Sequence, residues 1–180
     1  MLVSCLSVDC IYNTLLMPIL SFADLDSICV AVKAGNPHYV PDSAEWCTDL
    51  YFTGCRPSEI LDRKRWTYLG GTDYQLNPLK GNNPRYFDAS VLTGGLKRFI
   101  TTGTGYYNTA TYSRLQSIFR TTTPSSQVYR DTKAMDLYLF RYRFVKYQRL
   151  IGQTDAQIQA TMGWTNLAMV TEYADAVLVR

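Results

Sequence analysis

The stretch TGCRPSEI, residues 53–60, carries more structural information than any other part of this chain. Gly54 suits the end of a helix, and Pro57 suits the first turn of the next one. Arg56 is thereby placed at the junction between two helices. A guanidinium group and a helix N-terminus both suit a phosphate, and Glu59, one turn later, can hold the arginine in place. The pattern predicts either an anion site or an ordinary helix junction with a surface Arg–Glu pair.

Short β-favouring runs follow this junction. They are rich in aromatic residues, and glycine pairs or the run Gly81–Pro84 separate them. We expect a small antiparallel sheet with strands at Trp66–Leu69, Tyr74–Leu76 and Arg85–Phe87.

The remainder of the chain has mainly helical signals, namely apolar residues at helical spacing, capping residues and terminating glycines. The expected helices run from Ser21 to Val32, from Asp42 or Ser43 to about Phe52, from Ser90 to about Thr101, from Ala110 to Arg120, from Asp136 to Gly152, from Thr154 to Gly163 and from Leu167 to Val177. The expected fold class is α+β, mostly helical, with one small three-stranded antiparallel sheet.

Composition limits the possible functions. The chain has 180 residues, 47% of them hydrophobic, and its mean hydropathy of −0.13 is typical of a soluble globular protein. No apolar run is long enough to cross a membrane. Five cysteines without a C-x-x-C pair, and a single histidine, His38, make a zinc site improbable and indicate buried free thiols.

The charge is distributed unevenly along the chain. Residues 1–62 hold two basic and eight acidic side chains, a net charge of −6, whereas residues 63–180 hold sixteen basic and seven acidic ones, a net charge of +9. An anionic partner for the C-terminal two-thirds would explain this asymmetry, and so would a solvated basic face.

The segment YLFRY, residues 138–142, carries a second candidate phosphate ligand. Arg141 follows Tyr138 by one helical turn, so both side chains are expected on the same face of a helix. An unperturbed tyrosine has a pKa near ~10, so Tyr138 can donate a hydrogen bond but is a poor base. The ordinary interpretation makes Tyr138 and Tyr142 half-buried residues of an amphipathic helix.

Two further segments hold groups that suit phosphoryl transfer. MGWTN, residues 162–166, offers the indole N–H of Trp164, and Tyr173 follows that tryptophan by nine residues. Lys80 lies in a turn between two expected strands, where it can protonate a leaving oxygen or simply be a solvated turn residue. Lys64 is the second choice for this role.

Together these segments resemble the catalytic domain of the tyrosine recombinases, the phage-integrase family. TGCRPSEI resembles the family's first arginine box, T-G-x-R-x-S-E-[IL], YLFRY its H-x-x-R-H box, and MGWTN its L-G-H-x-[ST] box. Tyr138 and Tyr142 stand where the family usually has histidine. The resemblance covers residues 20–176, and its functional positions are Arg56, Glu59, Lys80, Tyr138, Arg141, Trp164 and Tyr173.

The resemblance implies a site-specific recombinase or integrase that cuts and rejoins DNA through a 3′-phosphotyrosine at Tyr173. Arg56 and Arg141 would clamp the phosphate, Trp164 and Tyr138 would donate hydrogen bonds, and Lys80 would protonate the leaving oxygen. No cofactor or metal is implied. The expected partners are double-stranded DNA and further copies of the chain, a tetramer in the family, with no membrane.

The resemblance also implies an intracellular, DNA-associated protein in the cytoplasm of a host cell, with a role in DNA integration by a mobile element or virus. Residues 1–20 are expected to be an N-terminal segment or the remnant of a linker, and residues 21–180 the catalytic domain. Two other functions stay open. The first is a catalytically impaired DNA-binding relative, favoured by the missing histidines. The second is a type IB topoisomerase-like strand transferase.

Overall fold

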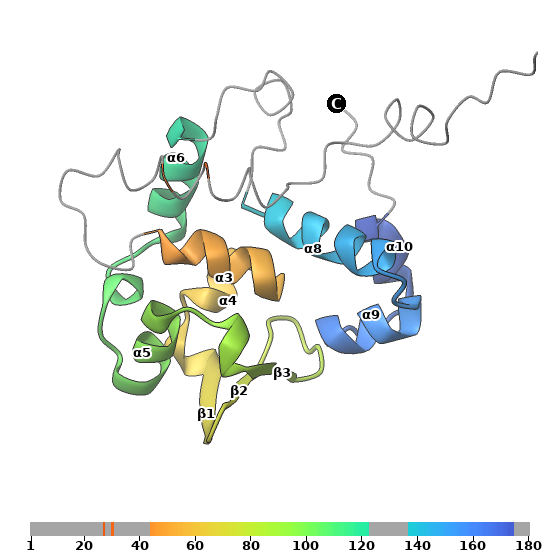
Figure 1. The fold of residues 1–180 in the computed structure, drawn as a ribbon, viewed down its shortest axis with the longest axis horizontal. Helices are drawn as coiled ribbons and strands as arrows, with labels where there is room; N and C mark the ends of the chain where they lie inside the picture. Colours follow the sequence, from red (N-terminus) through yellow and green to blue (C-terminus); the bar gives the residue numbers. More distant parts are fainter. Residues whose placement is uncertain (1–26, 28–29, 31–43, 123–136, 175–180) are drawn as a thin grey trace, which may run out of the picture.

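The computed structural model describes residues 27, 30, 44–122 and 137–174 (Figure 1). The expected mostly helical α+β architecture is confirmed. The helices are α3 (Glu45–Thr53), α4 (Pro57–Ile60), α5 (Gly94–Thr102), α6 (Tyr112–Thr122), α8 (Leu139–Leu150), α9 (Asp155–Met162) and α10 (Ala168–Ala174). In Figure 1, α8, α9 and α10 lie on one side of the molecule, α5 and the sheet on the other, with α3 and α4 between them.

The N-terminal predictions fall almost entirely outside the described residues. Of the helix expected from Ser21 to Val32, only Ser27 and Val30 are described, and both are helical. His38 and the boundary at residue 20 are not described, so the division into an N-terminal segment and a catalytic domain stays a prediction.

The three predicted strands form one antiparallel sheet in chain order, β1 (Trp66–Gly70), β2 (Asp73–Leu76) and β3 (Arg85–Asp88). Register places Trp66 opposite Leu76, and Leu76 opposite Arg85. All three side chains of this row are buried, whereas Tyr86, the next residue of β3, is exposed. The alternation of a strand therefore turns a charged residue, Arg85, toward the interior.

The start of α5 differs from the predicted one, because another residue caps the helix. Ser90 does not cap α5, because the Asp88 carboxylate accepts a hydrogen bond from Ser90 N and forms a 3₁₀ turn, η2 (Ala89–Val91). The N-cap of α5 is Thr93, whose hydroxyl accepts from Leu96 N. Thr154 caps α9 as predicted. Within the described ranges, no helix combines the length and apolar character that a bilayer crossing requires.

The starts of two other helices also differ from the prediction. The N-cap of α3 is Ala44, rather than Asp42 or Ser43, and that of α8 is Tyr138. Neither residue makes a side-chain capping hydrogen bond. Asp136, the predicted cap of α8, lies outside the described residues.

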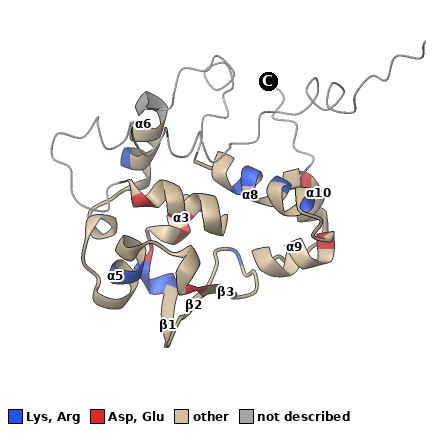
Figure 2. Cartoon of the chain, viewed as in Figure 1, with Lys and Arg blue, Asp and Glu red and all other residues tan. Residues whose placement is uncertain are grey.

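Charge of opposite sign is carried by α3 and α8, two helices that pack together. The sequence of α3 includes Glu45 and Asp49 and no basic residue. The sequence of α8 has basic residues and no acidic one, as Figure 2 shows. α8 packs against α3, α9 and α10. Part of the basic character of the C-terminal two-thirds is therefore carried by a helix that packs on an acidic one.

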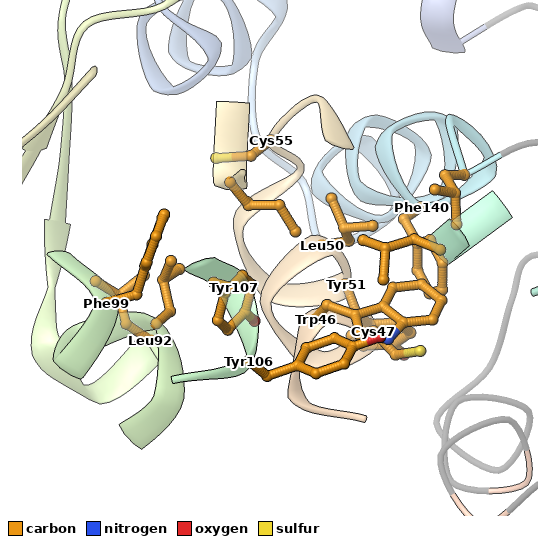
Figure 3. Close-up of a cluster of buried hydrophobic side chains, with 14 of the residues drawn as sticks. Trp46, Cys47, Leu50, Tyr51, Cys55, Leu92, Phe99, Tyr106, Tyr107 and Phe140 are labelled. Atoms are coloured by element: carbon orange, nitrogen blue, oxygen red, sulfur yellow. The ribbon is translucent and has the colours of Figure 1, made fainter. Parts of the chain in front are cut away.

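Helix α3 supplies much of the main hydrophobic core (Figure 3). Trp46 lies edge-on to Phe140 of α8, with 6.4 Å between ring centroids. On the other side of the core, Phe99 of α5 stacks on Tyr107 at 5.7 Å. A second, smaller cluster joins α8, α9 and α10 and consists of Phe144, Val145, Ile158, Met162, Trp164, Val170 and Tyr173. Two of the predicted functional residues, Trp164 and Tyr173, thus belong to this second core.

A buried carboxyl group ties α3 to the start of α5. Asp49 accepts hydrogen bonds from Thr93 N at 2.9 Å, from Thr93 Oγ1 at 2.8 Å and from the Tyr107 hydroxyl. Burial raises the pKa of Asp49 from 3.8 to about 7. Because the native pKa lies above that of the unfolded chain, Asp49 binds a proton more tightly in the folded protein.

We therefore expect the free energy of unfolding to decrease as the pH rises from about 5 to about 7, with a slope of at most about 1.4 kcal/mol per pH unit for one proton. The Asp49→Asn variant should lose this slope in urea unfolding followed by circular dichroism. Because histidine ordinarily has a pKa near ~6.5, His38→Gln, which removes the one histidine of the sequence, is the control and should keep the slope. An unchanged slope in Asp49→Asn would contradict the assignment.

Candidate active site

The junction predicted from TGCRPSEI is present, and α8 crosses directly over it. α3 ends at Gly54, whose φ of 59° is left-handed, and Arg56 is the N-cap residue of α4. A Cβ atom at position 54 would lie 2.7 Å from the Phe144 ring, so only glycine permits this approach of α8. One turn before Phe144, Arg141 donates from Nη1 to Gly54 O at 2.7 Å. The close packing of α8 on Gly54 thus places Arg141 beside the segment 53–60, which holds Arg56.

Glu59 is the anionic centre of this site. Its carboxylate is fully buried and accepts from the backbone N–H and the Nη1 of Arg56, both at 2.7 Å. Nη1 of Arg141 lies 4.0 Å from the same carboxylate. Burial alone would raise the pKa of Glu59, but Arg141 and the N–H and charge of Arg56 hold it below its ordinary value. Glu59 is therefore ionised and orients both arginines.

Arg141 and Trp164 present buried donors that are not satisfied within the described residues. Nε and Nη2 of Arg141, and Nε1 of Trp164, have no hydrogen-bond partner there. Burial and the positive charges of Arg85 and Arg56 lower the pKa of Arg141 to about 10, so it is still charged at neutral pH. Unpaired buried donors carry a desolvation cost of roughly 1–3 kcal/mol each. An anion is the partner that would satisfy all three.

Aromatic rings cover these donors. The Arg141 guanidinium carbon lies 5.2 Å from the centroid of Trp164 and 5.4 Å from that of Tyr173. Tyr173 is only 8% exposed and packs between Trp164, at 5.0 Å, and Tyr142, at 4.7 Å. Helix α10 therefore brings Tyr173 to the second arginine within a single chain.

Tyr138, at the start of α8, faces the same group of side chains. Burial raises the pKa of its phenol, while the charges of Arg56 and Arg141 act against this effect. Tyr173 and Glu59 also interact with it electrostatically. Because the phenol stays protonated near neutral pH, Tyr138 can donate a hydrogen bond but is poorly suited to act as a base.

Lys80 lies beside this cluster, on the connection from β2 to β3. Leu79 N donates to the Glu59 carboxylate at 3.3 Å, and Asn83 N donates to Gly163 O at 2.7 Å. The connection is therefore anchored next to Arg56 at one end and next to Trp164 at the other. Lys80 itself is exposed and has a φ of 66°, which points to a tightly turned backbone. Lys64, the second choice, is exposed on the 3₁₀ turn η1 (Arg63–Arg65).

A third buried arginine, Arg85 of β3, also belongs to the site, and the sequence reasoning did not assign it a role. Its Nε donates to Thr161 O at 2.9 Å, its Nη1 to Cys55 Sγ at 3.4 Å and its Nη2 to Thr53 O. Burial raises the pKa of the Cys55 thiol, which keeps this sulfur protonated. Strand alternation is the signal that identifies Arg85, because it shares the inward face with Phe87.

The site as a whole carries an excess of positive charge. Arg56, Arg85 and Arg141 are buried with a single carboxylate, Glu59, so that the charge of this group is +2. Burying uncompensated charge is unfavourable in the absence of a counterion. The arrangement therefore favours a bound anion. Among the described residues, no cluster of three His, Cys, Asp or Glu side chains suited to a metal ion is found.

Comparison with known proteins bears on the fold. A chain of the XerH site-specific recombinase bound to palindromic difH substrate, in a post-cleavage complex, is 15% identical, with a TM-score of 0.53 over 91% of this chain and 50% of that one. XerH bound to difH substrate in a pre-cleavage complex is 16% identical, with a TM-score of 0.52 over 87% of this chain and 50% of that one. This chain thus spans about half the length of the XerH chains.

No protein-family model matches the sequence, and a search of curated proteins finds no match. Structural likeness at 15–16% identity establishes the fold and leaves the activity to be argued from the site. The helices, the three-stranded sheet and the likeness to XerH all indicate the same fold. The chain has the fold of a tyrosine recombinase catalytic domain.

Proposed function

We propose that this chain is a DNA strand transferase of the recombinase type, with Tyr173 as its nucleophile. The observation that carries the proposal is the set of buried donors on Arg141 and Trp164 that have no partner among the described residues and that lie against the Tyr173 ring. A phosphodiester group carries the charge and the acceptor oxygens that this set lacks. For a phosphate oxygen to reach these donors, the Tyr173 ring must move away from the Arg141 guanidinium that it covers.

The proposed reaction exchanges one phosphate ester for another. The Tyr173 hydroxyl attacks the phosphorus in line, an O–P bond forms to the tyrosine, and the bond from phosphorus to the 5′-oxygen breaks. The phenol gives its proton to solvent water, the departing 5′-oxygen takes up a proton from the Lys80 ammonium, and Lys80 regains a proton from solvent. Attack by the 5′-hydroxyl of another strand reverses these steps, so the bond energy is conserved and no cofactor is required.

Transition-state stabilisation falls to the arginines. Negative charge develops on the non-bridging oxygens, and Arg56 and Arg141 are held in place to receive it before DNA arrives. Trp164 and Tyr138 add neutral donors. With no histidine at these positions, the reaction depends on this fixed positive field rather than on a strong general base.

The test is to trap the covalent intermediate. The protein is incubated with nicked DNA duplexes of randomised sequence, designed so that the short 5′ fragment diffuses away after cleavage. We expect an adduct that survives denaturation, and sequencing of the attached DNA gives the preferred site. DNA retention without any adduct would refute cleavage and favour the impaired DNA-binding relative. Relaxation of supercoiled DNA without joining of two duplexes would refute strand exchange and favour the topoisomerase-like function.

DNA binding by this chain should depend strongly on salt. Each neutralised phosphate contributes about −0.9 to the slope of log K against log salt, so two contacts alone reduce affinity by about tenfold from ~50 to ~200 mM. Lys80→Gln should lower the magnitude of the slope by about one unit in fluorescence anisotropy. Arg149 is already paired with Asp155 at 2.8 Å, so Arg149→Gln should leave the slope unchanged. An affinity independent of salt would exclude phosphate-driven binding.

A further inference from the structure

We propose that Arg85 is a positioning residue that fixes the distance between the arginine junction and Trp164; the inference rests on the proposed function. Its guanidinium group has partners on three elements. It bonds the end of α3 through Thr53 O, the junction through Cys55 Sγ, and the last turn of α9 through Thr161 O.

The hydrogen-bond partners separate Arg85 from the arginines that would receive phosphate. All three nitrogens of the Arg85 side chain donate to protein atoms, whereas two of the three in Arg141 are buried without a partner among the described residues. Arg85 is 2% exposed. It therefore has no donor nitrogen left without a partner, and it acts on a bound anion through the atoms that it holds.

The two clamped segments lead directly to the unpaired donors. Arg85 holds Thr53 O while Arg141 holds Gly54 O, so that successive carbonyl groups of the junction are fixed by two guanidinium groups. On the other side, Thr161 lies in the last turn of α9, three residues before Trp164 and separated from it by the left-handed Gly163. Displacement of either segment changes the separation between Arg141 and the Trp164 indole.

A second contact fixes the position of the end of α9 relative to the sheet, through the residues that precede β3. Gly163, with a φ of 67°, carries the carbonyl that accepts from Asn83 N. A Cβ at this position would collide with Asn83 O and would lie 3.0 Å from Arg85 Cγ. The end of α9 is thus seated on the residues that enter β3, and Arg85 is the side chain that holds it there.

Arg85 also adds charge. Together with burial and Arg56, it lowers the pKa of Arg141 to about 10. Removing Arg85 would weaken the attraction for an anion at Arg141 even if every atom kept its place. The neutral and charged replacements of Arg85 therefore separate the geometric from the electrostatic contribution.

The experiment observes the indole N–H resonances of ¹⁵N-labelled tryptophan. The chain has three tryptophans, so each reports on one place. Trp46 reports on the main core, Trp66 on the Glu59 carbonyl that its Nε1 contacts at 2.8 Å, and Trp164 on the anion site. In the wild-type protein, titration with inorganic phosphate should shift the Trp164 resonance and leave that of Trp46 in place.

Arg85→Met should move the Trp164 resonance in the free protein, keep that of Trp46, and weaken phosphate binding by about tenfold or more, the effect of losing one charge-assisted hydrogen bond. Arg85→Lys retains the charge, so its phosphate affinity should lie between those of Arg85→Met and the wild type. It replaces Arg85→Met as the test variant if that protein does not fold. The control is Arg63→Met, which also removes guanidinium–carbonyl bonds, to Ile100 O and Thr101 O, but away from the site.

The outcomes are distinguishable. A wild-type Trp164 resonance that does not respond to phosphate refutes the anion site, and with it both the proposed function and this inference. A wild-type response that Arg85→Met and Arg85→Lys reproduce with equal affinity refutes the positioning role alone. Movement of all three indole resonances in Arg85→Lys would mean a general structural role and would overturn the inference.

Discussion

Tyr173→Phe is expected to abolish the covalent protein–DNA adduct completely while leaving DNA affinity and stability close to wild type. The phenylalanine ring can keep the packing of Tyr173 against Trp164 and Tyr142, at 5.0 and 4.7 Å, and lacks only the hydroxyl that would form the phosphate ester. The measurement uses the nicked duplexes described above, with denaturing electrophoresis for the adduct and anisotropy for affinity.

The matched control for Tyr173→Phe is Tyr142→Phe, which removes a hydroxyl from the ring stacked on Tyr173. This variant should still form the adduct. Peptide mass analysis of the wild-type adduct should locate the DNA on Tyr173. An adduct on Tyr142, or one that persists in Tyr173→Phe, would show that another tyrosine is the nucleophile.

Arg141→Lys is expected to slow adduct formation by roughly 100- to 1,000-fold, the effect typical of losing a donor that stabilises developing negative charge. Lysine keeps the charge but cannot bond Gly54 O and also present two further nitrogens to a phosphate. Burial makes the loss more severe, because the Arg141 side chain is only 1% exposed and water cannot readily take its place. The rate is measured in single-turnover reactions at saturating DNA.

Arg143→Lys provides the control, because Arg143 lies on the same helix and is also buried. Its guanidinium contacts Tyr51 and Tyr147, and it donates from Nη2 to the Tyr51 hydroxyl at 2.6 Å. The variant should lose stability but keep its cleavage rate per folded molecule. Equal rates in Arg141→Lys and wild type would exclude Arg141 from the reaction.

The parts of the fold that the sequence predicted are those set by local chemistry. Gly54 and Pro57 end and begin helices because of their own backbone preferences, and the glycine-separated aromatic runs give the three strands. The start of α5 was predicted wrongly because Ser90 and Thr93 are both good caps. The competing bond from Ser90 N to Asp88 decides between them, and it depends on where β3 ends.

The spatial arrangement of the site depends on tertiary contacts that no local pattern encodes. The sequence placed Arg56 and Glu59 one turn apart, but it could not show that Glu59 also accepts from Leu79 N. Arg85 was assigned to a strand and given no role, because its partners lie at Thr53 and Thr161, far away in the sequence. The catalytic roles of the site residues remain predictions for the variants above.

The backbone on either side of Lys80 is already ordered in the free protein, because Leu79 and Asn83 are bonded to opposite sides of the site. Bringing Lys80 onto DNA therefore gives up mainly side-chain rotamer entropy, up to about 2 kcal/mol for a lysine. Without the two anchors, each backbone residue that became fixed would add about 1–2 kcal/mol. The reach of the ammonium group is set by its four-carbon stem from a fixed Cα, so a lysine moved along this connection would approach a different oxygen.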